Sequence, residues 1–267
     1  MVSPHSPNSP LLRQAGGKCS YLRMPWDVWL IFFALFVLLP WRGRARMQKL
    51  LVMPHVSSVE RLVLYASTIA FQWLAVAVVG WRVWVHGYTA RQLGLVLDDR
   101  TRLLVAALMG AAIIGGLQWL NLRRIGRIPA SSRGVMQAVA ERILPQSAVE
   151  LLAYLALAVT AGLCEEFLYR GFAMAALARA GLGAWLVVLA SSLLFGLAHS
   201  YQGKGGMVMT FVVGLVLGVS RLTYNSLVPA IVWHGAVDVV AGLAGRRYLV
   251  RNAMVPQERN LRQEGEL

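Results

Sequence analysis

Seven apolar stretches run through this chain of 267 residues, and they constrain its fold more than any other feature. They cover residues 26–39, 62–85, 103–122, 148–163, 182–198, 207–219 and 227–243. Because a bilayer offers no water to backbone N–H and C=O groups, stretches of this kind cross membranes as helices. Several are shorter than the roughly 20 residues that a straight crossing needs. The sequence predicts an all-α, polytopic transmembrane helical bundle with about seven spans, and eight spans remain an alternative.

The charged residues support a membrane location and indicate an orientation. Only 14% of the residues are charged, whereas soluble domains average about a quarter. The net charge of +14 would suit a nucleic-acid partner, but the basic residues flank the apolar stretches instead of forming one soluble face. We therefore expect the lipid bilayer as a partner and no nucleic acid. With seven crossings the positive-inside rule favours a cytoplasmic C-terminus, and an eighth span would invert the N-terminus.

Composition divides the chain into four regions. We predict a disordered N-terminal tail over 1–25, supporting transmembrane helices and basic connectors over 26–144, a working core over 145–245 and a solvated, basic cytoplasmic tail over 246–267. The core is placed there because the unusual polar residues of the apolar stretches gather in it.

Shorter features predict local structure. Basic connectors are expected at 41–61 and 123–145, and apolar residues at helical spacing over 134–144 predict a helix along the membrane surface. The pattern Gly214-Leu-Val-Leu-Gly218 predicts close helix packing. One cysteine lies in the polar tail and the other, Cys164, in an apolar stretch, which argues against a structural disulfide.

Three ionisable side chains, Glu165, Glu166 and Arg170, interrupt the fourth apolar stretch or follow it directly. A charge at the bilayer centre costs roughly 2.5–3.5 kcal/mol, so such residues face the protein interior, pair with one another or mark a working site. Glu166 and Arg170 are four residues apart and can form an ion pair on one helix face. Glu165 points about 100° away from Glu166. The alternative is that both glutamates only join helices through Arg170, but one glutamate would suffice for that.

Two further pairs, Phe195 with His199 and His234 with Asp238, each share a helix face. A single membrane histidine often only hydrogen-bonds a neighbouring helix. The expected turn at 181–183, however, places Glu165 and His199 at the same depth, sixteen residues to either side. Turns at 202–206 and 223–226 place His234 within about two helical turns of that depth. We expect the two histidines and Glu165 to converge.

The helix that carries Glu165 poses a problem of length. Unbroken over 147–180, it would be roughly 50 Å long, which exceeds one hydrocarbon core. We expect it to break or to leave the membrane, with Gly162 and Gly171 as candidate break points and Pro145 as a plausible start.

Three motifs occur in order on successive apolar segments: Glu-Glu-x-x-x-Arg at Glu165, Phe-x-x-x-His at Phe195, and His-x-x-x-Asp at His234. In these motifs the chain resembles the CPBP family of membrane proteins, which includes the type II CAAX prenyl endopeptidases and many bacterial intramembrane proteases. The resemblance covers residues 145–245. It implies hydrolysis of a peptide bond within a membrane, and an integral protein of a bacterial plasma membrane.

The resemblance also implies roles for the motif residues. Glu165 would activate the attacking water, His199 and His234 would bind a metal or stabilise the oxyanion, and Asp238 would orient or polarise. Asp238 stands where the prenyl endopeptidases tend to carry Asn, so donation to an oxyanion from this position requires a protonated carboxyl. Glu166 and Arg170, with Phe195, would support the site.

Zinc is the cofactor that a metalloprotease mechanism implies, with His199, His234 and Glu165 as its ligands. A metal-free glutamate mechanism is the alternative. The pattern His-Glu-x-x-His of soluble zinc proteases is absent from the sequence. The ligands of any metal would therefore have to come from three separate helices.

The sequence therefore favours an intramembrane endopeptidase that cuts a membrane-anchored protein or peptide near its cytoplasmic boundary. A non-catalytic membrane scaffold or regulator on the same fold is the alternative. A proton-coupled transporter would also bury carboxylates and histidines, but we find no inverted repeat with broken helices of the kind many transporters have.

Overall fold

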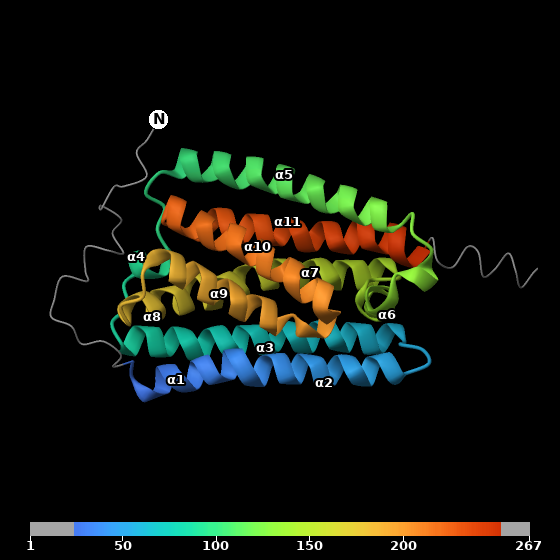
Figure 1. The fold of residues 1–267 in the computed structure, drawn as a ribbon, viewed down its shortest axis with the longest axis horizontal. Helices are drawn as coiled ribbons and strands as arrows, with labels where there is room; N and C mark the ends of the chain where they lie inside the picture. Colours follow the sequence, from blue (N-terminus) through green and yellow to red (C-terminus); the bar gives the residue numbers. More distant parts are fainter. Residues whose placement is uncertain (1–23, 252–267) are drawn as a thin grey trace, which may run out of the picture.

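The computed structural model describes residues 24–251, and in this part of the chain helices joined by short connections are the whole secondary structure, without strands (Figure 1). The α-helices are α1 (Trp26–Phe33), α2 (Leu39–Val52), α3 (Ser58–Val85), α4 (Ala90–Leu93), α5 (Arg100–Ile125), α6 (Gly134–Ile143), α7 (Ala148–Glu166), α8 (Met174–Arg179), α9 (Ala184–Ala198), α10 (Gly203–Tyr224) and α11 (Val228–Gly245). Short 3₁₀ turns occupy Ala130–Ser132 and Ser200–Gln202. Three π-helical segments, Ala34–Leu38, Phe167–Ala173 and Arg246–Arg251, continue α1, α7 and α11.

Every apolar stretch of the sequence forms a helix, which confirms the predicted all-α transmembrane bundle. Within residues 24–251, six helical runs are long and apolar enough to cross a membrane: Trp26–Val52, Ser58–Val85, Arg100–Ile125, Ala148–Arg179, Ser200–Tyr224 and Val228–Val250. The seventh apolar helix, α9, has 15 residues and is shorter than a full span. The described residues contain no eighth candidate.

Of the two alternatives expected for the helix that carries Glu165, the break at Gly162 or Gly171 is wrong, and the exit from the membrane stays a prediction. The helix begins at Ala148, capped by Ser147, and runs to Arg179 through the π-helical segment Phe167–Ala173. The π-helical segment keeps the backbone hydrogen-bonded through this region, so the run is continuous. Gly162 instead permits close packing, because a Cβ there would lie 3.1 Å from the Ile231 carbonyl oxygen of α11.

Two other predictions about connecting segments are corrected. The basic connector expected at 41–61 is helical as far as Val52, so only 53–57 join α2 to α3. Residues 246–251, expected in a solvated tail, continue α11 as a π-helical segment. Leu249 and Val250 are buried there, because they pack in a cluster with Tyr65 and other apolar side chains of the bundle. The helix expected at 134–144 is confirmed as α6.

The long helices lie nearly side by side, with α7 in the interior of the bundle (Figure 1). α7 packs against α3 on one side and α11 on the other, α5 covers α11, and α10 packs on α9. The prediction of close packing at Gly214 and Gly218 is confirmed: a Cβ on Gly218 would approach Val188 of α9 to 2.9 Å, and one on Gly214 would approach Ser192 to 3.2 Å.

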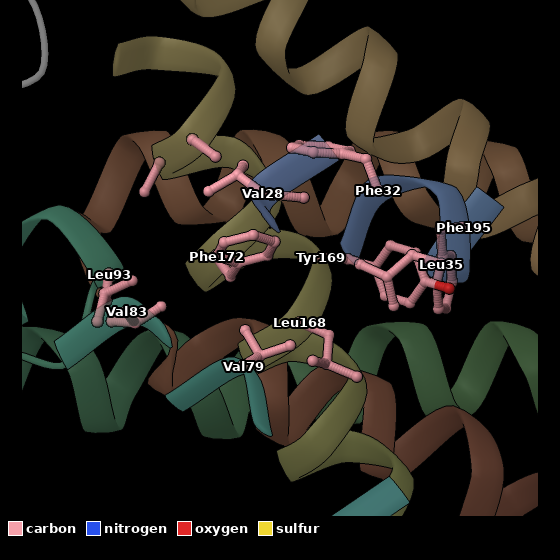
Figure 2. Close-up of a cluster of buried hydrophobic side chains, with 13 residues drawn as sticks. Val28, Phe32, Leu35, Val79, Val83, Leu93, Leu168, Tyr169, Phe172 and Phe195 are labelled. Atoms are coloured by element: carbon pink, nitrogen blue, oxygen red, sulfur yellow. The ribbon is translucent and has the colours of Figure 1, made fainter. Parts of the chain in front are cut away.

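One apolar cluster fixes the π-helical segment after Glu166. Figure 2 shows Phe172 of this segment between Val28 of α1 and Val79 of α3, with Leu168 nearby. The ring of Phe172 also contacts Phe32, with centroids 5.8 Å apart. The cluster therefore ties α1 and α3 to the turn that directly follows the two glutamates.

Two buried contacts fix how α3 lies along α7. Arg61 Nε donates a hydrogen bond to Glu150 Oε2 at 2.8 Å, and Arg61 Nη1 donates to the Val56 carbonyl oxygen. One turn farther along both helices, the rings of Tyr65 and Tyr154 meet edge to face, 5.6 Å apart. Increasing residue numbers on α3 meet increasing numbers on α7, so the two helices run parallel with a fixed register.

We expect Arg61→Met to destabilise the fold, because it leaves the buried Glu150 carboxylate without its cation. The loss should be about 3–5 kcal/mol, seen as a lower Tm in detergent. The double variant Arg61→Met with Glu150→Met, which leaves no unpaired charge, should lose less than Arg61→Met alone. A double variant that is less stable than the single one would contradict this account of the pair.

Candidate active site

The two carboxylate oxygens of Glu165 have different surroundings. Oε1 accepts a hydrogen bond from Gln72 Nε2 of α3 at 2.7 Å. Oε2 is buried and accepts no hydrogen bond from any residue of 24–251. It lies 3.9 Å from His199 Nε2 and 4.0 Å from His234 Nε2. The structure thus brings together the three side chains that the sequence expected to converge.

His199 is oriented by its own helix end. It follows the last residue of α9, and its Nδ1 lies 2.9 Å from the carbonyl oxygen of Phe195. Because a carbonyl only accepts, Nδ1 carries the proton of this hydrogen bond. The buried ring of Phe195 packs against both imidazoles, with centroids 4.7 Å from that of His199 and 5.5 Å from that of His234. Nε2 of His199 is left directed at Glu165.

His234 of α11 is oriented by the second glutamate of the pair. Its Nδ1 lies 2.8 Å from Glu166 Oε1 and donates to that carboxylate. Its Nε2 lies 3.5 Å from Asp238 Oδ2, one turn farther along α11. The Asp238 side chain is 30% exposed and that of His234 only 6%. Asp238 therefore lies at the more accessible edge of the cluster.

Glu166 and Arg170 form the predicted ion pair in the interior. Arg170 Nη1 lies 2.7 Å from Glu166 Oε1, and neither side chain has any exposed surface. Arg170 Nη2 donates to the Gly214 carbonyl oxygen of α10 at 3.2 Å, and the guanidinium lies 4.3 Å from the centre of the Phe195 ring. Glu166 thus joins Arg170 to His234, a connection that sequence reasoning missed.

Gln72 was also missed. It belongs to the region predicted to give only support, and its contact with Glu165 joins residues 93 positions apart. One signal was present in the sequence: Gln72 is the only Asn or Gln in the apolar stretch 62–85. An amide inside such a stretch needs a partner, because it cannot hydrogen-bond to lipid.

The residues expected to ligate zinc do not form a ready metal site as they are placed. Among the described residues, no group of three His, Cys, Asp or Glu side chains is arranged to hold a metal ion. Zinc binds imidazole nitrogen and carboxylate oxygen at about 2.0–2.2 Å, so tetrahedral ligand atoms would lie closer together than the 3.9 and 4.0 Å found between Glu165 and the two histidines. The donor set does not fit a zinc ion in this arrangement.

Comparison with known proteins supports the resemblance seen in the motifs. Residues 147–240 match the family model described as type II CAAX prenyl endopeptidase Rce1-like. All three motifs lie inside this segment, so the similarity to the CPBP and CAAX-protease family is confirmed for it. No curated protein and no solved structure resembles the chain closely enough to count as a match.

We expect Arg170→Met to unfold or strongly destabilise the protein, because Glu166 would keep a buried charge without its cation. The loss should be about 3–5 kcal/mol, measured as a lower Tm in detergent. The double variant Arg170→Met with Glu166→Gln, which leaves neither member of the pair charged, should cost less than Arg170→Met alone. Equal stability of Arg170→Met and wild type would show that the ion pair does not hold the site together.

Proposed function

We propose that this chain, whose residues 147–240 are similar to the CAAX prenyl endopeptidases, is an intramembrane endopeptidase that uses Glu165 as its general base. The observation that carries the proposal is the convergence of one unpaired carboxylate oxygen and two imidazole Nε2 atoms inside an apolar bundle. Carboxylates and imidazoles within hydrogen-bonding reach of one reacting group are the usual agents of acid–base hydrolysis.

In the proposed reaction Glu165 Oε2 takes a proton from a water molecule as its oxygen attacks the carbonyl carbon of the peptide bond. The electron pair of the C=O bond moves to the carbonyl oxygen. When this oxyanion collapses, the C=O bond re-forms, the C–N bond breaks, and Glu165 gives its proton to the leaving nitrogen. The products are a carboxyl group and an amine, and the carboxylate of Glu165 is restored.

His199 and His234 are proposed to stabilise the oxyanion as imidazolium cations, which carry a proton on Nε2 as well as on Nδ1. Both rings are held through Nδ1, by the Phe195 carbonyl and by Glu166. Nε2 of His199 is thereby left for substrate, whereas Nε2 of His234 also lies 3.5 Å from Asp238 Oδ2. Preoriented groups of this kind are effective because they need no reorganisation as charge develops. Zinc ligation by Glu165 and the two histidines is the alternative, and it would require these side chains to move closer together than they lie in this arrangement. No step above depends on a metal.

The proposed substrate is a membrane-associated protein or peptide. The reactive groups lie on membrane-spanning helices and on the end of α9. A substrate that is already associated with the membrane can reach them more readily than a soluble protein can. Among the site residues Asp238 is the most exposed. The proposed reaction takes place at the peptide bond and does not depend on a prenyl group.

We expect Glu165→Gln to abolish cleavage at normal abundance, because the amide keeps the shape of the side chain but cannot accept the proton of water. The measurement compares protein termini in membranes from cells that produce wild type or the variant. New termini should occur only with wild type.

Asp98→Asn is the matched control, since it makes the same acid-to-amide change in an exposed ion pair with Arg91. It should give the wild-type termini. If Glu165→Gln gave the same new termini as wild type, the mechanism would be wrong. If wild type produced no new termini either, we would prefer the hypothesis of a non-catalytic scaffold or regulator to that of an endopeptidase.

We expect Asp238→Asn to keep cleavage within about tenfold of wild type, a change of roughly 1.4 kcal/mol in the barrier. The amide has the same shape, can still accept from His234 through its oxygen, and offers an N–H to the oxyanion. Asp238→Leu should lose far more. Loss of cleavage in Asp238→Asn as complete as in Glu165→Gln would mean that the charge of Asp238 is itself required.

A further inference from the structure

We infer that Gln72 is a positioning residue that holds the Glu165 carboxylate for the proposed reaction, on which this inference rests. Gln72 lies in α3, outside the segment 147–240 that matches the protease family. Its amide nitrogen donates to Glu165 Oε1 at 2.7 Å. The site is therefore completed by a helix that the three motifs do not include.

The hydrogen bond decides which oxygen of Glu165 is free. The terminal torsion of a glutamate is broad and roughly two-fold, so an unheld carboxylate can turn. With Oε1 engaged by Gln72, Oε2 stays 3.9 Å from His199 Nε2 and 4.0 Å from His234 Nε2. A water molecule on Oε2 would then be presented between the two imidazoles.

The position of Gln72 along α7 is fixed by contacts of α3 on both sides of it. The ion pair of Arg61 with Glu150 and the contact of Tyr65 with Tyr154 fix α3 against α7 on one side of it. On the other side, Val79 belongs to the apolar cluster around Phe172. With contacts on both sides, α3 cannot slide along α7 without breaking a buried interaction.

A neutral donor suits this position for an electrostatic reason. The site already contains three carboxylates, those of Glu165, Glu166 and Asp238, and Arg170 pairs with Glu166. A cation at residue 72 would pair with Glu165 and make it a weaker base. The amide orients the carboxylate and leaves its charge available to water.

The test uses Gln72→Met, which keeps the length of the side chain and removes the amide. With a peptide that spans a bond cut by wild type, kcat should fall about 10- to 100-fold, while KM should change little, because Gln72 touches Glu165 and not substrate. Thr68→Val is the matched control, one turn earlier on α3, since among the described residues its hydroxyl bonds only to the Leu64 carbonyl of its own helix. It should keep the wild-type kcat.

A second measurement does not depend on proteolysis. The infrared difference between wild type and Glu165→Gln identifies the carboxylate stretch of Glu165. This band should shift in Gln72→Met and stay in place in Thr68→Val, which a general loss of packing would not produce.

The outcomes separate the two proposals. An unchanged kcat in Gln72→Met, with cleavage that still requires Glu165, overturns the inference and leaves the proposed function standing. An unshifted band overturns the contact itself. Absence of any cleavage by wild type overturns the proposed function. A shifted band would then still show the contact between Gln72 and Glu165, but the contact would have no role in catalysis.

Discussion

The arrangement of the site depends on one buried charge, the carboxylate of Glu166. Moving an ion of this size out of water costs several kcal/mol even after the protein relaxes, unless partners surround it. Glu166 has no exposed surface, and its partners are Arg170 on the same helical run and His234 on α11. Arg170 in turn reaches the Gly214 carbonyl of α10 and the Phe195 ring of α9. Four helical segments must therefore meet at one place for this charge to be tolerated.

Two neighbouring glutamates have opposite surroundings because of helical geometry. Successive residues of an α-helix point about 100° apart, so Glu166 faces the interior while Glu165 faces the two imidazole Nε2 atoms. Each carboxylate keeps one buried oxygen, Oε2, without a hydrogen bond from the described protein groups. Oε1 of Glu166 binds the cation of Arg170 and the ring of His234, whereas Oε1 of Glu165 binds only the neutral amide of Gln72 among the described residues. The inner carboxylate fixes His234, and the outer one is left for chemistry.

The sequence predicts much of the site because its spacing is local. Glu166 and Arg170 are one helical turn apart, and short turns set the depths of Glu165, His199 and His234. The remainder depends on contacts distant in the chain. Gln72 meets Glu165 only because Arg61 and Glu150, 89 positions apart, fix the register of α3 on α7. The burial of Leu249 and Val250 also depends on distant contacts, because they pack in a cluster with Tyr65. The basic residues beside them in the sequence suggested a solvated tail instead.

The π-helical segment Phe167–Ala173 has a consequence for evolution of the chain. Each π turn holds one residue more than an α turn, so the segment sets the angular phase between the two glutamates and the end of α8. There Arg179 lies over the ring of Tyr88 and donates to the His86 and Gly87 carbonyls. Loss of one residue between 166 and 179 would turn these two ends by about 100° relative to each other. A change of length here should therefore break the contacts of one end or the other, so the length of this segment should vary little among relatives.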